Sequence, residues 1–426
     1  MAIVGGGACG LMAAIALRDQ GVDCVVLERD ATPSGSTALS SGFIPAAGTR
    51  VQRSLGIEDS PALFAEDICA KAKGTAATHL VQAYAEACAA AIDRLGEHGL
   101  QFEVLTNFLY PGHRVHRMHS LPERTGAALV AALHRAAVAA GADFLTSARV
   151  TDLYVDSRDR VLGLGIARPG GEAERIACDM LLLACNGFGG NPALVRELLP
   201  EMRDAIFAGH QGNDGSAIQW GRALGAGLAD LGGYQGHGSW VVPQGALMTW
   251  AVMMQGGVQL NAQGRRFHDE TQGYSEAAVD VLAQPDGIAW NVFGNDQLSL
   301  AREFPDFRDA EAAGALRTAR DREELARIIG CQPWALAPEI ESFGPPFHAV
   351  RVTGALFHTQ GGLDIDAQCR VRRPDGATFP NLLAAGGAAR GVSGNAVWGY
   401  LSGNGLLSAV AGGWIAAQTA AQQVST

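Results

Sequence analysis

Three glycines near the N-terminus have the spacing of a phosphate-binding turn. Gly5, Gly7 and Gly10 form a G-x-G-x-x-G sequence between a short apolar strand and a helix of small residues. The first glycine allows the tight turn, the second lets the backbone approach a pyrophosphate, and the third lets the helix pack on the strand. A second apolar strand, at 24–27, ends in Glu28, whose carboxylate can accept both ribose hydroxyls of an adenosine. This βαβ unit predicts a bound adenine dinucleotide; the alternative is a glycine-rich turn that holds no ligand.

The composition is that of a globular protein of two domains. The chain has 426 residues, of which 48% are hydrophobic and 18% charged, and it is too long for one simple core. The net charge of −11 argues against a nucleic-acid partner and against an anionic membrane. The eight cysteines are scattered, without a C-x-x-C pair, so we expect no metal site and a reducing compartment. The longest late apolar run, at 406–417, is too short to span a bilayer. We therefore expect a soluble, cytoplasmic protein.

The elements that must position the glycine turn follow from hydrophobic periodicity. Helical periodicity covers about 60–99, and an amphipathic helix is predicted at 123–141. Two strand-like runs follow at 148–156 and 161–167. Long loops of small residues are unusual unless a ligand lies against them. The small, hydroxyl-rich segment 34–49 therefore predicts a loop beside the ligand.

Apolar strands that run into glycine turns occur again at 180–191 and 381–386. This pattern is typical of buried parallel strands that end at a ligand. Residues 232–346 are richer in Trp, Gln, Phe and Pro and contain a charged helical stretch at 318–329. Strand-like sequence resumes after them, so we expect 232–346 to be a second domain inserted into the first.

Several separated motifs occur in one order along the chain. They are the opening glycine unit, Ser-Gly-Ser-Thr-Ala-Leu-Ser-Ser-Gly at 34–42, Gly-Phe-Gly-Gly-Asn at 187–191, Gly-Asn-Asp-Gly at 212–215, Asn-Ala-Gln-Gly-Arg-Arg-Phe-His-Asp-Glu at 261–270, His-Thr-Gln-Gly-Gly-Leu-Asp-Ile-Asp at 358–366 and Leu-Ala-Ala-Gly at 383–386. In this order they resemble the flavoprotein family that includes fumarate reductase, succinate dehydrogenase and the 3-ketosteroid dehydrogenases. The resemblance covers nearly the whole chain. It implies an α/β fold with bound FAD: a Rossmann-like FAD-binding domain at 1–231 and 347–426, and an inserted α+β capping domain at 232–346.

The resemblance also implies which residues hold FAD. Val150 is expected beside the adenine and Asp214 beside the flavin-side sugar chain. The last helix follows the loop 400–407, and its N-terminal N–H groups are expected to face the flavin pyrimidine and stabilise negative charge there. The alternative for this loop is an ordinary glycine-rich helix start. The expected cofactor-binding residues are Gly5, Gly7, Ala8, Cys9, Gly10, Glu28, Arg29, Ser36, Thr37, Ser40, Ser41, Gly42, Val150, Ala184, Asn186, Gly187, Asn191, Asp214, Gly386, Gly403, Asn404, Leu406 and Leu407.

Tyrosines occur where the fumarate reductases of this family have arginines. The stretches 269–274 and 395–400 contain no arginine and end in Tyr274 and Tyr400, which resembles the ketosteroid dehydrogenases. Tyr110 is a looser match to the third active-site tyrosine of those enzymes. The resemblance implies that tyrosines polarise a ketone and remove one proton while a hydride passes to the flavin. The pKa of a tyrosine base would have to be lowered from its usual value of about 10.

Two histidines complete the expected catalytic set. His358 and His237 resemble the substrate ligands of fumarate reductases. We expect an FAD-dependent oxidoreductase acting on CH–CH groups, with a neutral, ring-like ketone as substrate. One alternative is a small unsaturated carboxylic acid bound by His358, His237 and Arg390. Another is an electron-transfer flavoprotein without turnover.

Two further expectations concern partners. Whether the small-molecule substrate is a carbonyl or a carboxylate compound, an external electron acceptor or donor is needed, because the sequence has no Cys-x-x-Cys-His haem motif. The basic segment 113–119 is expected to be a solvated or phosphate-facing loop. Its alternative is a site for a carboxylated or CoA-bearing substrate.

Overall fold

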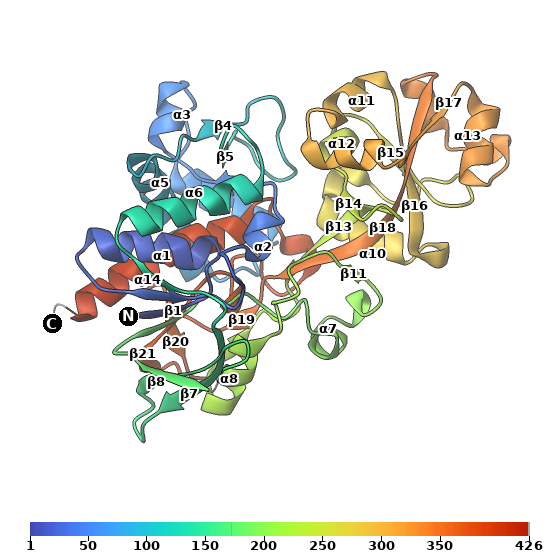
Figure 1. Ribbon diagram of the computed structural model, residues 1–426. Coiled ribbons are helices and arrows are strands. Elements are labelled where there is room, and N and C mark those ends of the chain that lie inside the picture. The colour runs from blue at the N-terminus through green and yellow to red at the C-terminus, as the bar shows by residue number, and fades with distance from the viewer. Residues whose placement is uncertain (172, 425–426) are drawn as a thin grey trace. The chain divides into compact units, whose positions relative to one another are not determined.

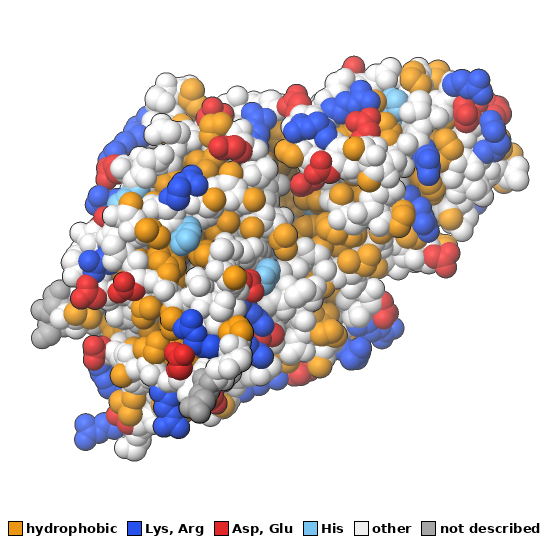
Figure 2. Space-filling view, in the orientation of Figure 1, with side chains coloured by type: hydrophobic (Ala, Val, Ile, Leu, Met, Phe, Trp, Pro, Cys, Tyr) orange, Lys and Arg blue, Asp and Glu red, His pale blue; other side chains and the backbone are white. Residues whose placement is uncertain are grey.

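The computed structural model describes residues 1–171 and 173–424. It divides into two compact units. The first contains Met1–Leu199, Gly209–Tyr234 and the segment from His358 onward, and the second contains Pro200–Ala208 and Gln235–Phe357. Acidic and basic side chains are interspersed on the face drawn in Figure 2.

A six-stranded sheet organises the first unit (Figure 1). Its strands, in spatial order, are β20 (Arg370–Arg372), β21 (Thr378–Ala384), β10 (Leu181–Leu183), β1 (Ala2–Val4), β2 (Val25–Leu27) and β6 (Asp143–Leu145). All neighbours are parallel except β20, which is antiparallel to β21. Because Val4 pairs with Leu183 and Leu27, the carboxyl ends of these strands meet at one edge. Ligands bind at such an edge in open α/β sheets.

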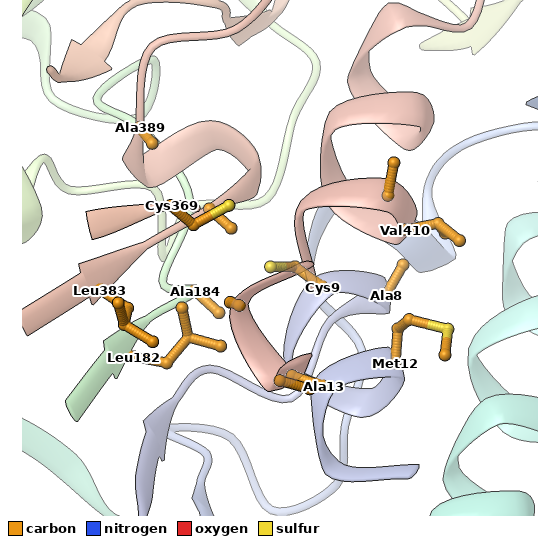
Figure 3. Close-up of a cluster of buried hydrophobic side chains, with 14 of the residues drawn as sticks. Ala8, Cys9, Met12, Ala13, Leu182, Ala184, Cys369, Leu383, Ala389 and Val410 are labelled. Carbon is orange, nitrogen blue, oxygen red and sulfur yellow. The ribbon is translucent and has the colours of Figure 1, made fainter. Parts of the chain in front are cut away.

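Helices α1 (Ala8–Asp19), α6 (Gly126–Ala139) and α14 (Asn404–Val424) pack together beside this sheet (Figure 1). Figure 3 shows Cys9 and Met12 of α1 together with Val410 of α14, all of them buried. Helix α14 approaches α1 closely, since a Cβ at Gly413 would lie 2.4 Å from the carbonyl oxygen of Cys9. The side chain of Thr125 caps the N-terminus of α6 by accepting a hydrogen bond from the backbone N–H of Ala128.

Smaller elements complete the first unit. They are α2 (Gly35–Ala38), β3 (Ile44–Pro45), α3 (Arg50–Ser54), α4 (Pro61–Lys71), α5 (Thr78–Glu97), β4 (Glu103–Val104), β5 (Met118–Ser120), β7 (Arg149–Val155), β8 (Val161–Ala167), β9 (Glu174–Ala177), α7 (Pro192–Leu198), α8 (Ser216–Leu224), β12 (Leu228–Ala229), β19 (Gly362–Leu363) and the 3₁₀ turns Gly386–Ala388 and Val397–Gly399. Strands β7, β8 and β9 form an antiparallel meander, and β8 contacts β21.

The second unit is built on a mostly antiparallel sheet. Its path is β14 (Ala246–Leu247), β13 (Tyr234–Val241), β18 (Phe347–Thr359), β16 (Ile288–Phe293) and β15 (Val258–Leu260), with β11 (Ile206–Phe207) and β17 (Leu316–Ala319) also paired to β18. The first residue of β13 and the last two of β18 belong to the first unit. The helices are α9 (Ala251–Met254), α10 (Tyr274–Leu282), α11 (Asn295–Ala301), α12 (Pro305–Ala312) and α13 (Arg322–Ile329). The 3₁₀ turns are Pro200–Met202, Glu270–Gln272, Pro285–Gly287, Pro333–Ala335 and Pro338–Ser342.

Most predicted elements are present, and two differ. The region 34–49 is not a plain loop, because it contains α2 and β3. The charged stretch 318–329 begins as the end of β17, since the side chain of Asp321 caps α13 and starts that helix only at Arg322. Beyond the predicted insertion 232–346, the second compact unit also includes Phe347–Phe357, the larger part of β18. A change in composition does not reveal how far such a strand pairs.

Within residues 1–171 and 173–424, no helix is long and apolar enough to cross a membrane. The same residues contain no group of three or more His, Cys, Asp or Glu side chains arranged to hold a metal ion. All eight cysteines are free thiols.

Candidate functional site

In the glycine turn between β1 and α1, two glycines have no space for a side chain and one has space. Gly5 has φ +109°, and a Cβ there would lie 2.5 Å from the carbonyl oxygen of Ala184. A Cβ at Gly10 would lie 2.0 Å from the carbonyl oxygen of Gly5. At Gly7, by contrast, the one described heavy atom within 4 Å is Thr37 Oγ1, at 3.3 Å. The fold therefore requires Gly5 and Gly10, whereas Gly7 leaves space in front of the helix N-terminus.

Glu28 lies at the adjacent strand end and is 6% exposed. Its Oε2 accepts a hydrogen bond from Gly6 N (2.7 Å), and its Oε1 accepts one from Asp30 N (2.9 Å). A carboxylate oxygen has two lone pairs, so each oxygen retains one for a ribose hydroxyl. Open space at the glycine turn beside an acceptor of this kind fits the pyrophosphate and ribose of FAD.

The hydroxyl-rich segment is held against the start of α1. Thr37 Oγ1 accepts a hydrogen bond from Ala8 N (3.0 Å). Ser40 Oγ donates to Thr37 O (2.7 Å) and accepts from Gly42 N (3.1 Å). The side chain of Asn213 donates to Ser36 Oγ (2.9 Å), a link that the list of cofactor-binding residues from the sequence left out. The sequence signal for Asn213 is its position in the Gly-Asn-Asp-Gly turn, where a short polar side chain can reach the cofactor.

Asp214 lies beside Arg29, which follows shortly after the end of β2. Arg29 Nη1 donates to Asp214 Oδ2 (3.1 Å) and to Gly212 O (2.8 Å). Burial acts to raise the pKa of Asp214, but hydrogen bonds from Ser216 and the charge of Arg29 outweigh it and lower that pKa. Arg29 directly follows Glu28, so this carboxylate lies toward the predicted adenosine end. Its expected place beside the flavin-side sugar chain stays a prediction.

Val150 lies near the same end of the sheet. It is buried in β7, and Ala148 N, just before this strand, donates to the backbone oxygen of Glu28 (2.8 Å). The start of β7 is therefore beside the ribose acceptor. This placement supports an adenine contact at Val150, which stays a prediction.

Expected cofactor-binding residues also follow two other strands, β10 and β21, at the same edge of the six-stranded sheet. Ala184 and Asn186 follow β10, and Gly386 follows β21 with φ +60°. Asn186 has φ +65° and accepts a hydrogen bond from Gly187 N (2.8 Å). Asn191 is different, because its Oδ1 caps α7 and its Nδ2 donates to Asp214 O (2.9 Å). The amide of Asn191 is thus engaged within the protein.

The N-terminus of α14 contains buried polar atoms that lack partners. Gly403 has φ +88° and precedes Asn404, which is fully buried. Among the described residues, Asn404 Oδ1 and Ser408 Oγ have no hydrogen-bond partner. Buried polar atoms normally have partners. These orphan atoms, with the helix dipole behind them, fit a polar ring system such as the flavin pyrimidine.

The first unit also holds three of the expected catalytic residues. His358 lies edge-on to Tyr400, with ring centroids 5.6 Å apart. Tyr110 begins a tight turn in which His113 N donates to Tyr110 O (3.1 Å). His113 Nε2 in turn donates to Ser402 O (2.9 Å). The turn that carries Tyr110 is therefore tied to the loop before α14.

The second unit holds the other two expected catalytic residues. The rings of His237 and Tyr274 stack, with centroids 4.7 Å apart and planes 20° apart, and Trp250 meets His237 edge-on. Burial lowers the pKa of His237 to about 3. Its Nδ1 accepts a hydrogen bond from Ser239 N (3.1 Å), so the proton of the neutral ring is on Nε2.

The basic segment 113–119 is not a solvated or phosphate-facing loop, and that interpretation is wrong. Arg117 is buried and binds Asp59 through two hydrogen bonds (2.7 and 2.9 Å) as well as pairing with Asp67. Arg114 pairs with Asp67 and with Glu66. The positive charges of Arg114 and Arg117 are thus compensated within the protein. This weighs against the alternative that the segment binds a carboxylated or CoA-bearing substrate. The compensating acids precede the segment by about 50 residues, so its local sequence could not reveal them.

Two buried histidines of this segment predict sensitivity to acid. Burial lowers the pKa of His113 and of His119 to about 4, whereas an unfolded histidine titrates near 6.5. Unfolding therefore takes up protons between about pH 6.5 and 4. The free energy of unfolding should fall as the pH decreases through this window. Urea unfolding at pH 7 and pH 5 measures this. In the variant His119→Gln the free energy of unfolding should depend less steeply on pH, by about 1 kcal/mol per pH unit. An unchanged dependence would contradict the lowered pKa of His119.

Comparisons with known proteins agree with this geometry. The family model described as the FAD binding domain matches residues 1–406. The NADH:fumarate oxidoreductase of Klebsiella pneumoniae (strain 342) is 26% identical over 99% of this chain and 47% of its own length, so the chain spans about half of that relative. The open form of a flavocytochrome c3 fumarate reductase superposes with a TM-score of 0.85 at 25% identity, over 100% of this chain and 78% of that one.

A further solved structure shows the same fold. The 3-ketosteroid-Δ4-(5α)-dehydrogenase of Rhodococcus jostii RHA1 superposes with a TM-score of 0.77 at 23% identity, over 99% of this chain and 96% of that one. The resemblance to this flavoprotein family, the α/β fold class and the FAD prediction are thereby confirmed. The chain belongs to the FAD binding domain family, and its cofactor is FAD.

Proposed function

We propose that this chain is the catalytic part of an FAD-dependent oxidoreductase that acts on a carbon–carbon bond conjugated to a carbonyl group, with an uncharged, ring-like ketone as its substrate. Bound FAD supplies the hydride acceptor or donor that no side chain can provide. The expected catalytic residues are Tyr110, Tyr400 and His358 of the first unit, and Tyr274 and His237 of the second. The direction of turnover is set by an external electron acceptor or donor.

The observation that carries the substrate class is the absence of charge among these five residues. Burial lowers the pKa of His358 to about 4 and that of His237 to about 3, so both imidazoles are neutral near pH 7. The other three are tyrosines. Binding of a dicarboxylate is favoured by cationic donors, above all bidentate arginine. A neutral carbonyl oxygen instead accepts hydrogen bonds from neutral O–H and N–H groups.

The tyrosines have definite tasks in this proposal. Desaturation beside a ketone needs a donor that polarises the carbonyl oxygen and a base that removes one proton. A tyrosine hydroxyl donates in the first task, and a tyrosinate accepts the proton in the second. Tyr400 and Tyr274 are 5% and 8% exposed. Each is therefore shielded from bulk water, which strengthens a hydrogen bond to developing enolate charge.

A small unsaturated carboxylic acid is the second candidate substrate. The Klebsiella relative, whose name specifies fumarate, favours it. Arg390 would be its main anion ligand, with His358 and His237. However, Arg390 Nε donates to Asp230 Oδ2 (2.6 Å), and its Nη1 lies 3.4 Å from Asp364 Oδ1. Two carboxylates already compensate this guanidinium, which weighs against binding a third.

Reduction of the flavin by substrate tests the proposal. The FAD-loaded protein is mixed anaerobically with neutral cyclic ketones and, separately, with saturated mono- and dicarboxylic acids, and the flavin absorbance is followed. The dithionite-reduced protein is mixed with the corresponding unsaturated compounds. Exchange of electrons with the ketones alone supports the proposal. Exchange with the acids alone supports the second candidate, and a flavin that responds to dithionite but to no substrate supports an electron-transfer protein without turnover.

The ion pairs of Arg390 give a separate prediction. Arg390→Met should lower the free energy of unfolding by about 1–3 kcal/mol, because it leaves Asp230 without its partner in a partly buried setting, whereas Asp364 keeps Arg372 (3.8 Å). KM for a neutral substrate should not change. Thermal unfolding and steady-state kinetics measure the two effects. A variant of full stability whose KM for carboxylic acids alone rises would assign Arg390 to substrate binding instead.

A further inference from the structure

Three buried side chains form a continuous hydrogen-bonded chain that ends at His358. Asn404 Nδ2 donates to Ser393 Oγ (2.9 Å), and Ser393 Oγ donates to Gln360 Oε1 (2.9 Å). Gln360 Nε2 then lies 3.0 Å from His358 Nδ1. Gln360, Ser393 and Asn404 are at most 4% exposed, so no bulk water competes for these bonds. We call these three residues the relay.

Each hydrogen bond of the relay has a defined donor and acceptor, because each group carries a fixed number of protons. An amide nitrogen can only donate, so Ser393 Oγ accepts from Asn404 and gives its single proton to Gln360 Oε1. The Gln360 amide is thereby oriented with its NH₂ group toward the imidazole. Two groups face His358 Nδ1: Gln360 Nε2 at 3.0 Å and the carbonyl oxygen of Thr359 at 3.4 Å. The shorter contact, with a nitrogen that can only donate, makes Nδ1 the acceptor and leaves the ring proton on Nε2.

Both ends of the relay are anchored to the backbone. Gln360 N donates to Gly233 O (2.8 Å), and Gly391 N donates to Gln360 O (2.8 Å). Asn404 is the first residue of α14, a helix of 21 residues. A Cβ at Gly405 would lie 2.7 Å from His358 Nε2. The Nε2 edge of the ring is therefore against the first turn of α14, the turn whose orphan polar atoms fit the cofactor.

We propose that Gln360, Ser393 and Asn404 are positioning residues that hold His358 as a neutral imidazole with its proton on Nε2, so that it donates a hydrogen bond to the substrate carbonyl oxygen and does not transfer a proton. The part of this inference that concerns the carbonyl rests on the proposed function. The part that concerns the ring proton does not. The lowered pKa of His358 agrees with a neutral ring.

Nitrogen-15 NMR of the FAD-loaded protein tests the ring proton directly. The histidines are labelled with ¹⁵N, and the His358 signals are identified by their loss in His358→Gln. In the wild type, Nδ1 should have a pyridine-like shift and Nε2 a pyrrole-like shift from pH 6 to 8. A pyrrole-like Nδ1 in the wild type would overturn the inference.

Gln360→Glu should reverse the assignment. A carboxylate accepts from both Ser393 and His358 Nδ1–H, so it should move the ring proton to Nδ1 and raise the pKa of His358. Nε2 would then present a lone pair to the carbonyl oxygen, and kcat should fall roughly 10- to 100-fold with KM changed less. Gln360→Met should give a mixture of the two tautomers. Unchanged ring shifts in both variants would overturn the inference.

Thr419→Val is the matched control. It removes another side-chain hydrogen bond of α14, the partly buried one from Thr419 Oγ1 to Gln368 O (2.8 Å), far along the helix from Asn404. The His358 signals and kcat should match the wild type. If the ring shifts behave as expected but no neutral ketone is turned over, the relay is supported and the proposed function fails.

Discussion

Gly7→Val should yield a folded protein without FAD. The turn at Gly7 has ordinary extended dihedral angles, φ −78° and ψ −173°, which a valine adopts without strain. A Cβ there meets one described heavy atom, Thr37 Oγ1, at 3.3 Å. The added methyl groups instead occupy the space in which the pyrophosphate is expected, at the N-terminus of α1.

The size of the effect follows from the cost of overpacking. Forcing extra methyl groups against a fixed partner costs about 1–3 kcal/mol, so Gly7→Ala should weaken FAD binding roughly 10- to 100-fold. Gly7→Val, with two more methyl groups, should be purified without flavin. Flavin absorbance of the purified protein and titration of the apoprotein with FAD measure the loss, while circular dichroism monitors folding.

Gly96→Ala is the control for a glycine replacement as such. Gly96 lies in α5, and nothing described comes within 4 Å of an added Cβ. Alanine in a helix is favoured over glycine by about 0.5–1 kcal/mol, so this variant should be at least as stable and should bind FAD normally. Full FAD occupancy in Gly7→Val would refute the assigned pyrophosphate position.

Tyr274→Phe and Tyr400→Phe should each lower kcat by roughly 10²–10⁴-fold while FAD stays bound, because a general acid or base contributes about that much. Phenylalanine keeps the stacking of residue 274 on His237 and the ring contact of residue 400 with His358. Only the hydroxyl group is lost, so the fold should be retained. Single-turnover reduction of the flavin by an active ketone measures the chemical step without the external acceptor.

The alternative substrate class predicts the opposite order of the effects that these variants have on kcat. If the substrate is a small carboxylic acid, His358→Ala should be severe and both Tyr→Phe changes nearly silent. For a neutral ketone, His358→Ala should be milder than either tyrosine change. Tyr154→Phe is the control, since Tyr154 is 36% exposed on β7 beside Arg175, and it should leave kcat unchanged.

The cofactor and the framework that holds it could be predicted from the amino-acid sequence. Gly5, Gly10 and Glu28 could be assigned from spacing alone because the βαβ unit is local: turn, helix start and acid are fixed by short-range geometry. The apolar strands that run into glycine turns at 180–191 and 381–386 could likewise be predicted, because strands buried on both faces are continuously apolar. Their parallel register then placed Glu28, Ala184 and Gly386 at one edge of the sheet.

The pairing of polar groups that lie far apart in the chain could not be predicted in this way, because folding brings them together. The charge of Arg117 is compensated by Asp59 and Asp67, and that of Arg390 by Asp230, 160 positions earlier. Periodicity carries no information about such pairs, so a buried ion network resembled a basic loop. The relay from Asn404 to His358 is similar, since its hydrogen bonds join three separate segments of the first unit. A hydrogen bond needs atoms within about 3 Å, and that condition is met only once the chain has folded.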